Sequence, residues 1–219
     1  MPIASDLRNL LRSGVHRMGE LGFQSGVSNH SYVLYHWLDT GRSRQPAFGG
    51  LELHEGPGAA RDLSLFTADG HYRFAKGQTN LQRGWVMVLA SEEDLRQALD
   101  QFYPAGVGLF LAHQRGTLET ENLRAKLERQ SGMYRFARTI SDAGAQRLVR
   151  EVCGPAHQCA KRILWQIDAN TPLEDSPASR YNGIADKLPE SAAIPLLCRE
   201  ACNHFVAECR KAAKDEAAS

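Results

Sequence analysis

Between residues 27 and 90, hydrophobic and polar positions alternate with a period of two, a spacing typical of half-buried β-strands. Five segments carry this alternation: SYVLYHWLD (31–39), GLELH (50–54), RDLSLFT (61–67), HYRFAKG (71–77) and WVMVLAS (85–91). Glycine-containing turn segments separate them, and ADG before His71 suits a hairpin turn. The pattern predicts an antiparallel sheet of four or five strands.

Elsewhere the hydrophobic positions recur at steps of three and four residues, which is the spacing of amphipathic helices. Helices are predicted at residues 5–21, 92–102, 117–130, 142–153, 159–165 and 195–211. Ser91 is a good helix start, because it offers a hydroxyl cap followed by three acidic residues in the first turn, and Ser141-Asp142 is expected to cap a second helix. The apolar segment GLFLAH (108–113) is expected to form a strand or a buried connection.

Together these patterns predict an α+β protein with two domains. Residues 1–115 are expected to form a domain built on an antiparallel sheet with flanking helices, and residues 116–219 an all-helical domain. A chain of 219 residues is long enough to bury two small cores.

The amino-acid composition limits the classes of protein to which this chain can belong. The net charge of +1 and a hydrophobic content of 42% are ordinary for a soluble globular protein. No apolar run approaches the ~20 residues of a membrane span, and the N-terminus lacks the apolar core of a signal peptide. We therefore expect a cytoplasmic protein without a membrane segment. The near-neutral charge and the lack of an aromatic–basic motif argue against nucleic acid as a partner. No catalytic residue is predicted, because no nucleophile–base triad, phosphate loop or carboxylate pair stands out.

The last third of the chain contains all the cysteines: Cys153, Cys159, Cys198, Cys202 and Cys209. The first pair has five intervening residues, the second pair has three, and 38 residues separate the pairs. On a helix over 195–211, the second pair would project from one face about 5–6 Å apart at Cβ. Gly154-Pro155 interrupts the helix within the first pair, so the chain can turn there. The first four cysteines are therefore predicted to hold a cubane 4Fe-4S cluster, which usually takes four thiolates.

Other roles for these cysteines stay open on the residues alone. Cysteine is among the most often buried residues, so Cys198, Cys202 and Cys209 also fit a core stripe on a helix. Disulfides are disfavoured by the odd number of cysteines and the absence of a secretory signal. Zinc sites usually have shorter spacings within each pair. Cys209 itself is either a packed residue or an alternative ligand.

The segment 124–162 is basic, with nine lysines and arginines against three acidic residues. A solvated surface explains part of this excess. A four-thiolate cluster is negatively charged, however, and nearby cations would stabilise it and raise its reduction potential. They would also attract an acidic electron-donor protein or a polycarboxylate tetrapyrrole.

Two longer stretches resemble a known family. ERQSGMYRFARTISDAGAQRLVREVC (128–153), followed by CAKRILW (159–165), resembles the C-terminal 4Fe-4S domain of multidomain sirohydrochlorin (CbiX-type) chelatase-like proteins. YRFAKGQTNLQRGW (72–85) and ALDQFYPAG (98–106) are similar to the small stabilising domain that precedes it there. The cysteine spacing also looks like that of sirohaem-dependent sulfite and nitrite reductases, which are far longer. No stretch resembles the chelatase domain itself.

The family resemblance implies an iron–sulfur protein of sirohaem or cobalamin biosynthesis that is linked to a chelatase. It would pass electrons, sense redox state or iron supply, or stabilise its partner. The resemblance also marks Arg129, Tyr134 and Arg135 as groups that support the cluster or contact a ligand. The alternatives are a cluster-dependent reductase, and a protein whose cluster is purely structural.

Overall fold

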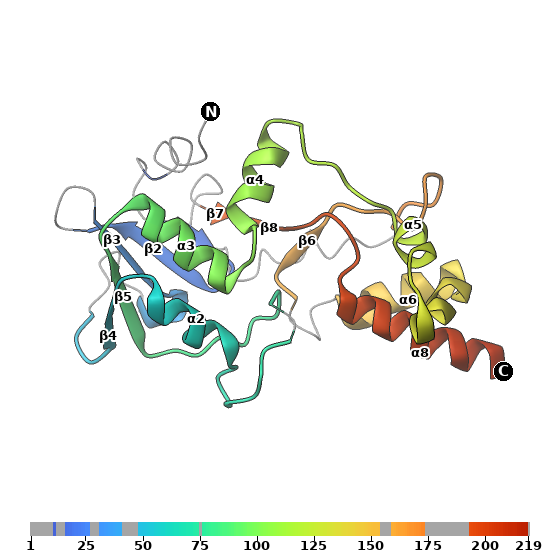
Figure 1. Ribbon diagram of the computed structural model, residues 1–219, viewed down its shortest axis with the longest axis horizontal. Coiled ribbons are helices and arrows are strands. Elements are labelled where there is room, and N and C mark those ends of the chain that lie inside the picture. Colours follow the sequence, from blue (N-terminus) through green and yellow to red (C-terminus); the bar gives the residue numbers. More distant parts are fainter. Residues whose placement is uncertain are drawn as a thin grey trace. The chain divides into compact units, whose positions relative to one another are not determined.

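In a computed structural model of the chain, six short strands form one sheet (Figure 1). The structure describes residues 11, 16–26, 31–40, 48–74, 76–153, 159–173 and 193–218. The strands are β1 (His16–Met18), β2 (Leu21–Ser25), β3 (Tyr32–His36), β4 (Glu52–Glu55), β5 (Trp85–Leu89) and β7 (Ala193–Ile194), and the 3₁₀ helix η1 (Trp37–Thr40) follows β3. The α+β class predicted from the sequence is confirmed.

The sheet is mixed, with the strand order β4-β5-β3-β2-β1-β7. The four central strands pair antiparallel, whereas β4 runs parallel to β5 and β7 runs parallel to β1. The prediction of an antiparallel sheet is therefore wrong at both edges. Parallel neighbours require a crossover or a distant segment, and alternation within one strand does not reveal which segment will pair with it.

Two of the five predicted strands do not form within the described residues. Residues 61–65 belong to helix α2 (Gly58–Leu65), and residues 71–77 contribute only an isolated bridge. In this second segment the buried position carries a charged residue, and the apolar positions are exposed, which is the opposite of the prediction. Arg73 is buried, while Tyr72 and Phe74 are exposed. The period of two in this segment therefore reflects the burial of a charged side chain, not the burial of an apolar strand face.

Two further helices follow β5: α3 (Glu92–Phe102) and α4 (Gly106–Gln114). Ser91 caps α3 as predicted, because its Oγ accepts a hydrogen bond from the Asp94 amide at 3.1 Å. The segment 108–113 lies in α4 and forms no strand. Helix α3 packs against α2 and on β3 and β5 (Figure 1). No helix among the described residues is long and apolar enough to cross a membrane.

The helix predicted at residues 5–21 is wrong over its second half, where β1 and β2 form an antiparallel pair. Residues 1–10 and 12–15 lie outside the described part of the chain. Met18 and Leu21 fit a helical spacing, but both are fully buried in the strand pair. Gly19 has φ +59 between them, and a Cβ there would approach the Tyr103 ring to 2.6 Å. The turn therefore needs glycine.

A buried ionic network lies beside this turn. The Glu20 carboxylate accepts a hydrogen bond from the Leu81 amide at 3.0 Å and lies 3.7 Å from Arg73 Nη2 and 3.4 Å from His36 Nε2. The Arg73 guanidinium is fully buried and lies 5.5 Å from the centre of the Tyr103 ring. Burial, and next the Glu20 charge, raise the pKa of Tyr103 to about 12. The network joins segments that are distant in sequence.

The described residues divide into two compact units. The first contains those up to 116 together with 193–196, and the second contains those from 117 to 173 together with 197–218. The elements that complete the chain are α5 (Leu123–Glu128), η2 (Gly132–Thr139), α6 (Asp142–Val152), β6 (Lys161–Ile163), β8 (Leu196–Cys198) and α8 (Asn203–Ala218). Ser141 caps α6 as predicted, because its Oγ accepts a hydrogen bond from the Gly144 amide at 2.9 Å.

The C-terminal part is not all-helical, because β6 and β8 form a two-stranded sheet. The predicted helix at 159–165 is β6, the one at 195–211 begins only at Asn203, and the one at 117–130 shortens to α5. Immediately after β6, the Leu164 amide donates to the Cys198 carbonyl at 3.0 Å. The backbone groups of each strand form hydrogen bonds with a segment more than thirty residues away. The spacing of hydrophobic residues within either segment does not indicate this pairing.

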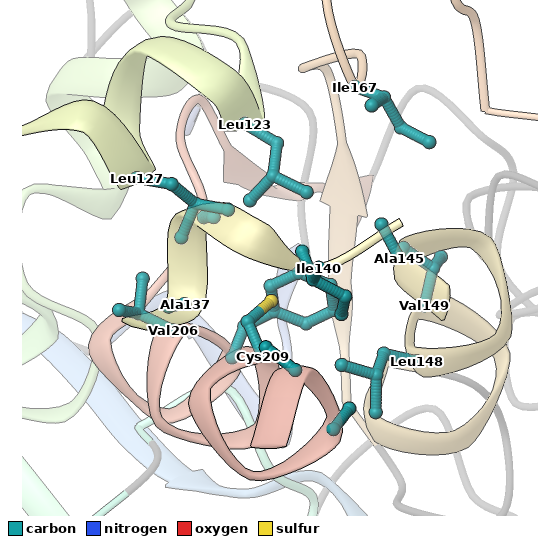
Figure 2. Packing of buried hydrophobic residues seen from close by; sticks show 14 of the residues in the cluster. Leu123, Leu127, Ala137, Ile140, Ala145, Leu148, Val149, Ile167, Val206 and Cys209 are labelled. Carbon is teal, nitrogen blue, oxygen red and sulfur yellow. The ribbon is translucent and has the colours of Figure 1, made fainter. Parts of the chain in front are cut away.

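The second unit has its own hydrophobic core (Figure 2). Leu123 and Leu127 from α5, Leu148 from α6 and Val206 from α8 are among its buried residues. The α8 residue Cys209 lies among them and is fully buried. This core sets the positions of the segment ends that carry the other four cysteines.

Candidate metal centre

Four cysteines lie at the ends of elements of the second unit. Cys153 follows α6 and its amide donates to the Val149 carbonyl at 3.0 Å. Cys159 lies two residues before β6, Cys198 is the last residue of β8, and Cys202 immediately precedes α8. Segment ends place side chains at one edge of a core, where a ligand can be held between elements.

The helical geometry predicted for the second pair is wrong. Cys198 ends a strand and Cys202 precedes a helix, so the two thiols do not project from one helix face. The helix break predicted at Gly154-Pro155 lies outside the described residues. The placement of the thiols is therefore set by the pairing of β6 with β8 and by the packing of α6 against α8.

The thiols share one electrostatic neighbourhood. Burial raises the pKa of Cys153, and the negative charges of Cys159, Cys202, Cys198 and Cys209 raise it further. Burial likewise raises the pKa of Cys159, with Cys202 adding to the effect. For Cys198, burial raises the pKa to about 11, and the thiols of Cys202 and Cys159 contribute in the same direction. Each thiol is therefore disfavoured as a thiolate both by burial and by the charge of the others.

Hydrogen-bond donors point at two of the sulfurs. The Trp165 indole Nε1 donates to Cys198 Sγ at 3.4 Å, and the Phe205 amide donates to Cys202 Sγ at 3.5 Å. Burial is the largest effect on the pKa of Cys198 and raises it. The Trp165 hydrogen bond and the positive charge of Lys161 lower this pKa by smaller amounts. Both interactions stabilise a thiolate. Sequence reasoning did not single out Trp165 or Lys161, although both lie within six residues of Cys159.

Cys209 differs from the other four cysteines. It has no exposed surface and belongs to the hydrophobic core, with Ile140 and Val206 nearby in Figure 2. Burial raises the pKa of its thiol to about 12. Of the two roles that the sequence left open for Cys209, a packed core residue is the one that this environment favours.

Three residues were predicted to support the cluster or contact a ligand. Arg129 forms an ion pair with Glu121 and lies 3.9 Å from Glu200, between Cys198 and Cys202 in the chain. The carboxylate of Glu200 also lies 3.2 Å from Lys126 Nζ. Arg129 is thus linked to the segment between Cys198 and Cys202 through the Glu200 carboxylate.

The other two residues of this set lie on the surface of η2. The Tyr134 ring lies 5.3 Å from the Arg210 guanidinium, and the Arg135 guanidinium lies 5.6 Å from the centre of the Phe136 ring. Both η2 residues are exposed. Their side chains contact aromatic and basic groups of the surface of this unit.

The donor chemistry of these four thiols fits a 4Fe-4S cluster. Four cysteine thiolates are its usual ligands, and hydrogen bonds to the sulfurs are among the features that tune it. Within the described ranges, no three His, Cys, Asp or Glu side chains are drawn together tightly enough to hold a metal ion. The histidines of the first unit likewise form no such group among the residues that the structure describes.

Comparison with known families matches each half of the chain to a different domain. Residues 5–114 match the DR2241 stabilising domain, and residues 115–211 match a 4Fe-4S iron-sulfur cluster binding domain. A 4Fe-4S cluster-binding domain is therefore present, as the sequence predicted.

Two individual proteins are also similar. The crystal structure of DR2241 from Deinococcus radiodurans, a multi-domain protein with structural similarity to chelatases and two additional novel domains, is 26% identical. It superimposes with a TM-score of 0.74 over 97% of this chain. A DNA topoisomerase 3 from Vibrio cholerae is 27% identical over 145 residues, 60% of this chain. The chain spans 41% of the former protein and 22% of the latter.

Proposed function

Because this chain belongs to the DR2241 stabilising-domain family and carries a 4Fe-4S cluster-binding domain, we propose that it is an iron–sulfur accessory protein of tetrapyrrole biosynthesis. It would transfer electrons in sirohaem or cobalamin synthesis and act together with a chelatase. The chelatase link is supported by the chelatase-like architecture of the Deinococcus radiodurans protein. The proposed setting is the cytoplasm, where thiols stay reduced.

The proposed cluster ligands are Cys153, Cys159, Cys198 and Cys202. The observation that carries this assignment is the position of the four thiols at or beside the ends of α6, β6, β8 and α8, with hydrogen-bond donors on the sulfurs of Cys198 and Cys202. When bound, the cluster would supply a site that accepts and releases one electron. Trp165 and the Phe205 amide would hold negative charge on the thiolates by donating hydrogen bonds, and Lys161 would add a positive charge nearby.

Electron transfer is favoured over a purely structural cluster by the position of Cys202. This residue is exposed, whereas Cys153, Cys159 and Cys198 are partly buried. A ligand that reaches the surface shortens the path between the cluster and an external partner. A purely structural centre has no need for such a ligand.

Anaerobic purification tests the redox role. The visible spectrum would be recorded before and after dithionite, with iron and sulfide counted in the same sample. We expect a broad visible band that bleaches on reduction and about four irons per chain. A colourless, iron-free protein after anaerobic reconstitution would refute a cluster function. An iron-loaded protein that dithionite does not reduce would refute electron transfer.

The tetrapyrrole role needs a separate test in cells. Cells that lack the protein should accumulate metal-free tetrapyrroles, detected by their fluorescence after chromatographic separation. The wild-type gene should restore the normal profile, and the Cys198→Ser variant should not. An unchanged tetrapyrrole profile in the deletion strain would refute this role while leaving the cluster in place.

A further inference from the structure

The 3₁₀ helix η2 exposes an unusual apolar surface. Met133, Tyr134 and Phe136 are 61%, 40% and 47% exposed, respectively. Only Ala137 of this helix is buried, and η2 packs along α8. Large exposed apolar side chains that lie together mark candidate interaction sites.

Three cations surround these apolar groups. The Arg210 guanidinium lies 5.3 Å from the Tyr134 ring centre, and Lys214 Nζ lies 5.9 Å from the centre of the Phe136 ring. Arg210 Nη1 also contacts Met133 Sδ at 2.9 Å. Arg210 and Lys214 are four residues apart on α8 and therefore share a side of that helix. We call Met133, Tyr134, Arg135, Phe136, Arg210 and Lys214 the η2 face.

The cations of the η2 face are Arg135, Arg210 and Lys214. Within the described chain, none of its three cations forms an ion pair with a carboxylate. Neighbouring charges are paired: Lys211 Nζ lies 2.6 Å from Glu208, and the Glu216 carboxylate accepts hydrogen bonds from Ser141. The face therefore combines an apolar centre with positive charge that has no carboxylate partner among the described residues.

We propose that the η2 face is the docking surface for an acidic electron-donor protein. Tyrosine, phenylalanine, methionine and arginine are enriched at protein interfaces, and tyrosine and arginine are frequent among their hot spots. Uncompensated cations select a partner whose surface is negative and accelerate its association. This inference rests on the proposed redox function, and it names the class of partner that would supply the electron.

The η2 face is close in the chain to a proposed ligand. Helix α8 begins immediately after Cys202, and Arg210 lies eight residues further on. At a rise of about 1.5 Å per residue, this separation corresponds to about 12 Å along the helix axis. A donor that docks at Arg210 would therefore lie about two helical turns along α8 from the exposed cysteine.

A reduced plant-type [2Fe-2S] ferredoxin is a suitable probe, because it is an acidic protein that donates one electron. The ferredoxin would give one electron to the oxidised cluster held by the four cysteines, without bond formation or proton transfer. The rate would be followed by stopped-flow absorbance at several salt concentrations. For the wild-type protein we expect a second-order rate constant that falls as salt rises.

The test compares two charge-reversed proteins with the same net charge. Arg135→Glu with Lys214→Glu alters the η2 face, whereas Arg61→Glu with Arg115→Glu alters exposed arginines of the first unit. The first pair should lower the rate constant by about tenfold or more and reduce its salt dependence, because steering is lost. The control pair should stay within about twofold of the wild type. If the first pair loses iron, Arg135→Gln alone replaces it.

Reduction by dithionite separates failure of this inference from failure of the proposed function. Both double variants should be reduced by dithionite as the wild type is, because a small reductant needs no docking surface. Equal ferredoxin rates in the two double variants would overturn the docking surface. A wild-type protein that dithionite reduces and ferredoxin does not would overturn it as well. If dithionite fails to reduce the wild type, the redox function itself is wrong.

Discussion

The indole Nε1 of Trp165 donates a hydrogen bond to Cys198 Sγ at 3.4 Å, across 33 residues of sequence. An indole N–H can only donate, so in a buried site it needs an acceptor such as this sulfur. Trp165 also packs against Phe205, with ring centres 5.4 Å apart. The same side chain thus supports the core and stabilises negative charge on a proposed ligand.

Removal of this donor should make the cluster harder to reduce. Trp165→Phe keeps an aromatic ring in the core but leaves the sulfur without its hydrogen bond. A loss of about 0.5–1 kcal/mol of preference for the reduced state corresponds to a potential about 20–40 mV lower for a one-electron couple. An anaerobic redox titration followed by electron paramagnetic resonance measures this shift. An unchanged potential would show that the bond does not tune the cluster.

Replacement of single cysteines should separate ligands from core residues. Cys→Ser at 153, 159, 198 or 202 should sharply lower the iron content and the visible absorbance. Cys209→Ala should keep about the wild-type iron content and destabilise the fold by about 1 kcal/mol, because it removes one buried sulfur atom. Iron analysis and thermal unfolding measure the two effects. Loss of iron in Cys209→Ala would identify Cys209 as a ligand.

The buried network of the first unit should make a large contribution to stability. Glu20→Ala leaves the Arg73 guanidinium buried without its carboxylate partner, so we expect a loss of about 3 kcal/mol or more in the free energy of unfolding. Urea unfolding measures this loss. Arg83→Ala serves as the control, because it removes an exposed partner of Asp39 and should cost at most about 1 kcal/mol. Equal losses in the two variants would contradict the prediction.

Tyr103 should make the fold sensitive to alkaline pH. Its pKa is raised from 10.0 to about 12 in the folded chain, chiefly by burial and further by the Glu20 charge. Above pH 10 the unfolded chain releases a proton that the folded chain keeps. The stabilisation is therefore complete below pH 10 and is lost as the pH rises toward 12.

The comparison with Tyr103→Phe isolates this effect. The variant lacks the titrating hydroxyl, so between pH 9 and pH 11 it should lose less stability than the wild type. Anaerobic urea unfolding at both values, followed by tryptophan fluorescence, measures the difference. Parallel pH profiles for the two proteins would show that the folded and unfolded pKa values of Tyr103 coincide.

The sequence alone determined the features whose signals lie within a few residues. The hydroxyl caps at Ser91 and Ser141 were predicted because a cap and its helix turn are adjacent in the chain. The α+β class followed from the change in hydrophobic period between the two halves, and the cluster type from the number and grouping of cysteines. The family resemblance strengthened the cluster prediction, since it covered both the thiols and the segment before them.

Only the tertiary structure decided the features that depend on distant partners. β8 ends at Cys198 because it pairs with β6, although the local sequence has helical spacing. Cys209 lies in the core because α5, α6 and η2 cover that side of α8. Arg73 is buried because the carboxylate of Glu20, in the turn between β1 and β2, lies beside its guanidinium group. Strand pairing and burial are long-range interactions, and their free energy depends on surfaces that meet only when the chain folds.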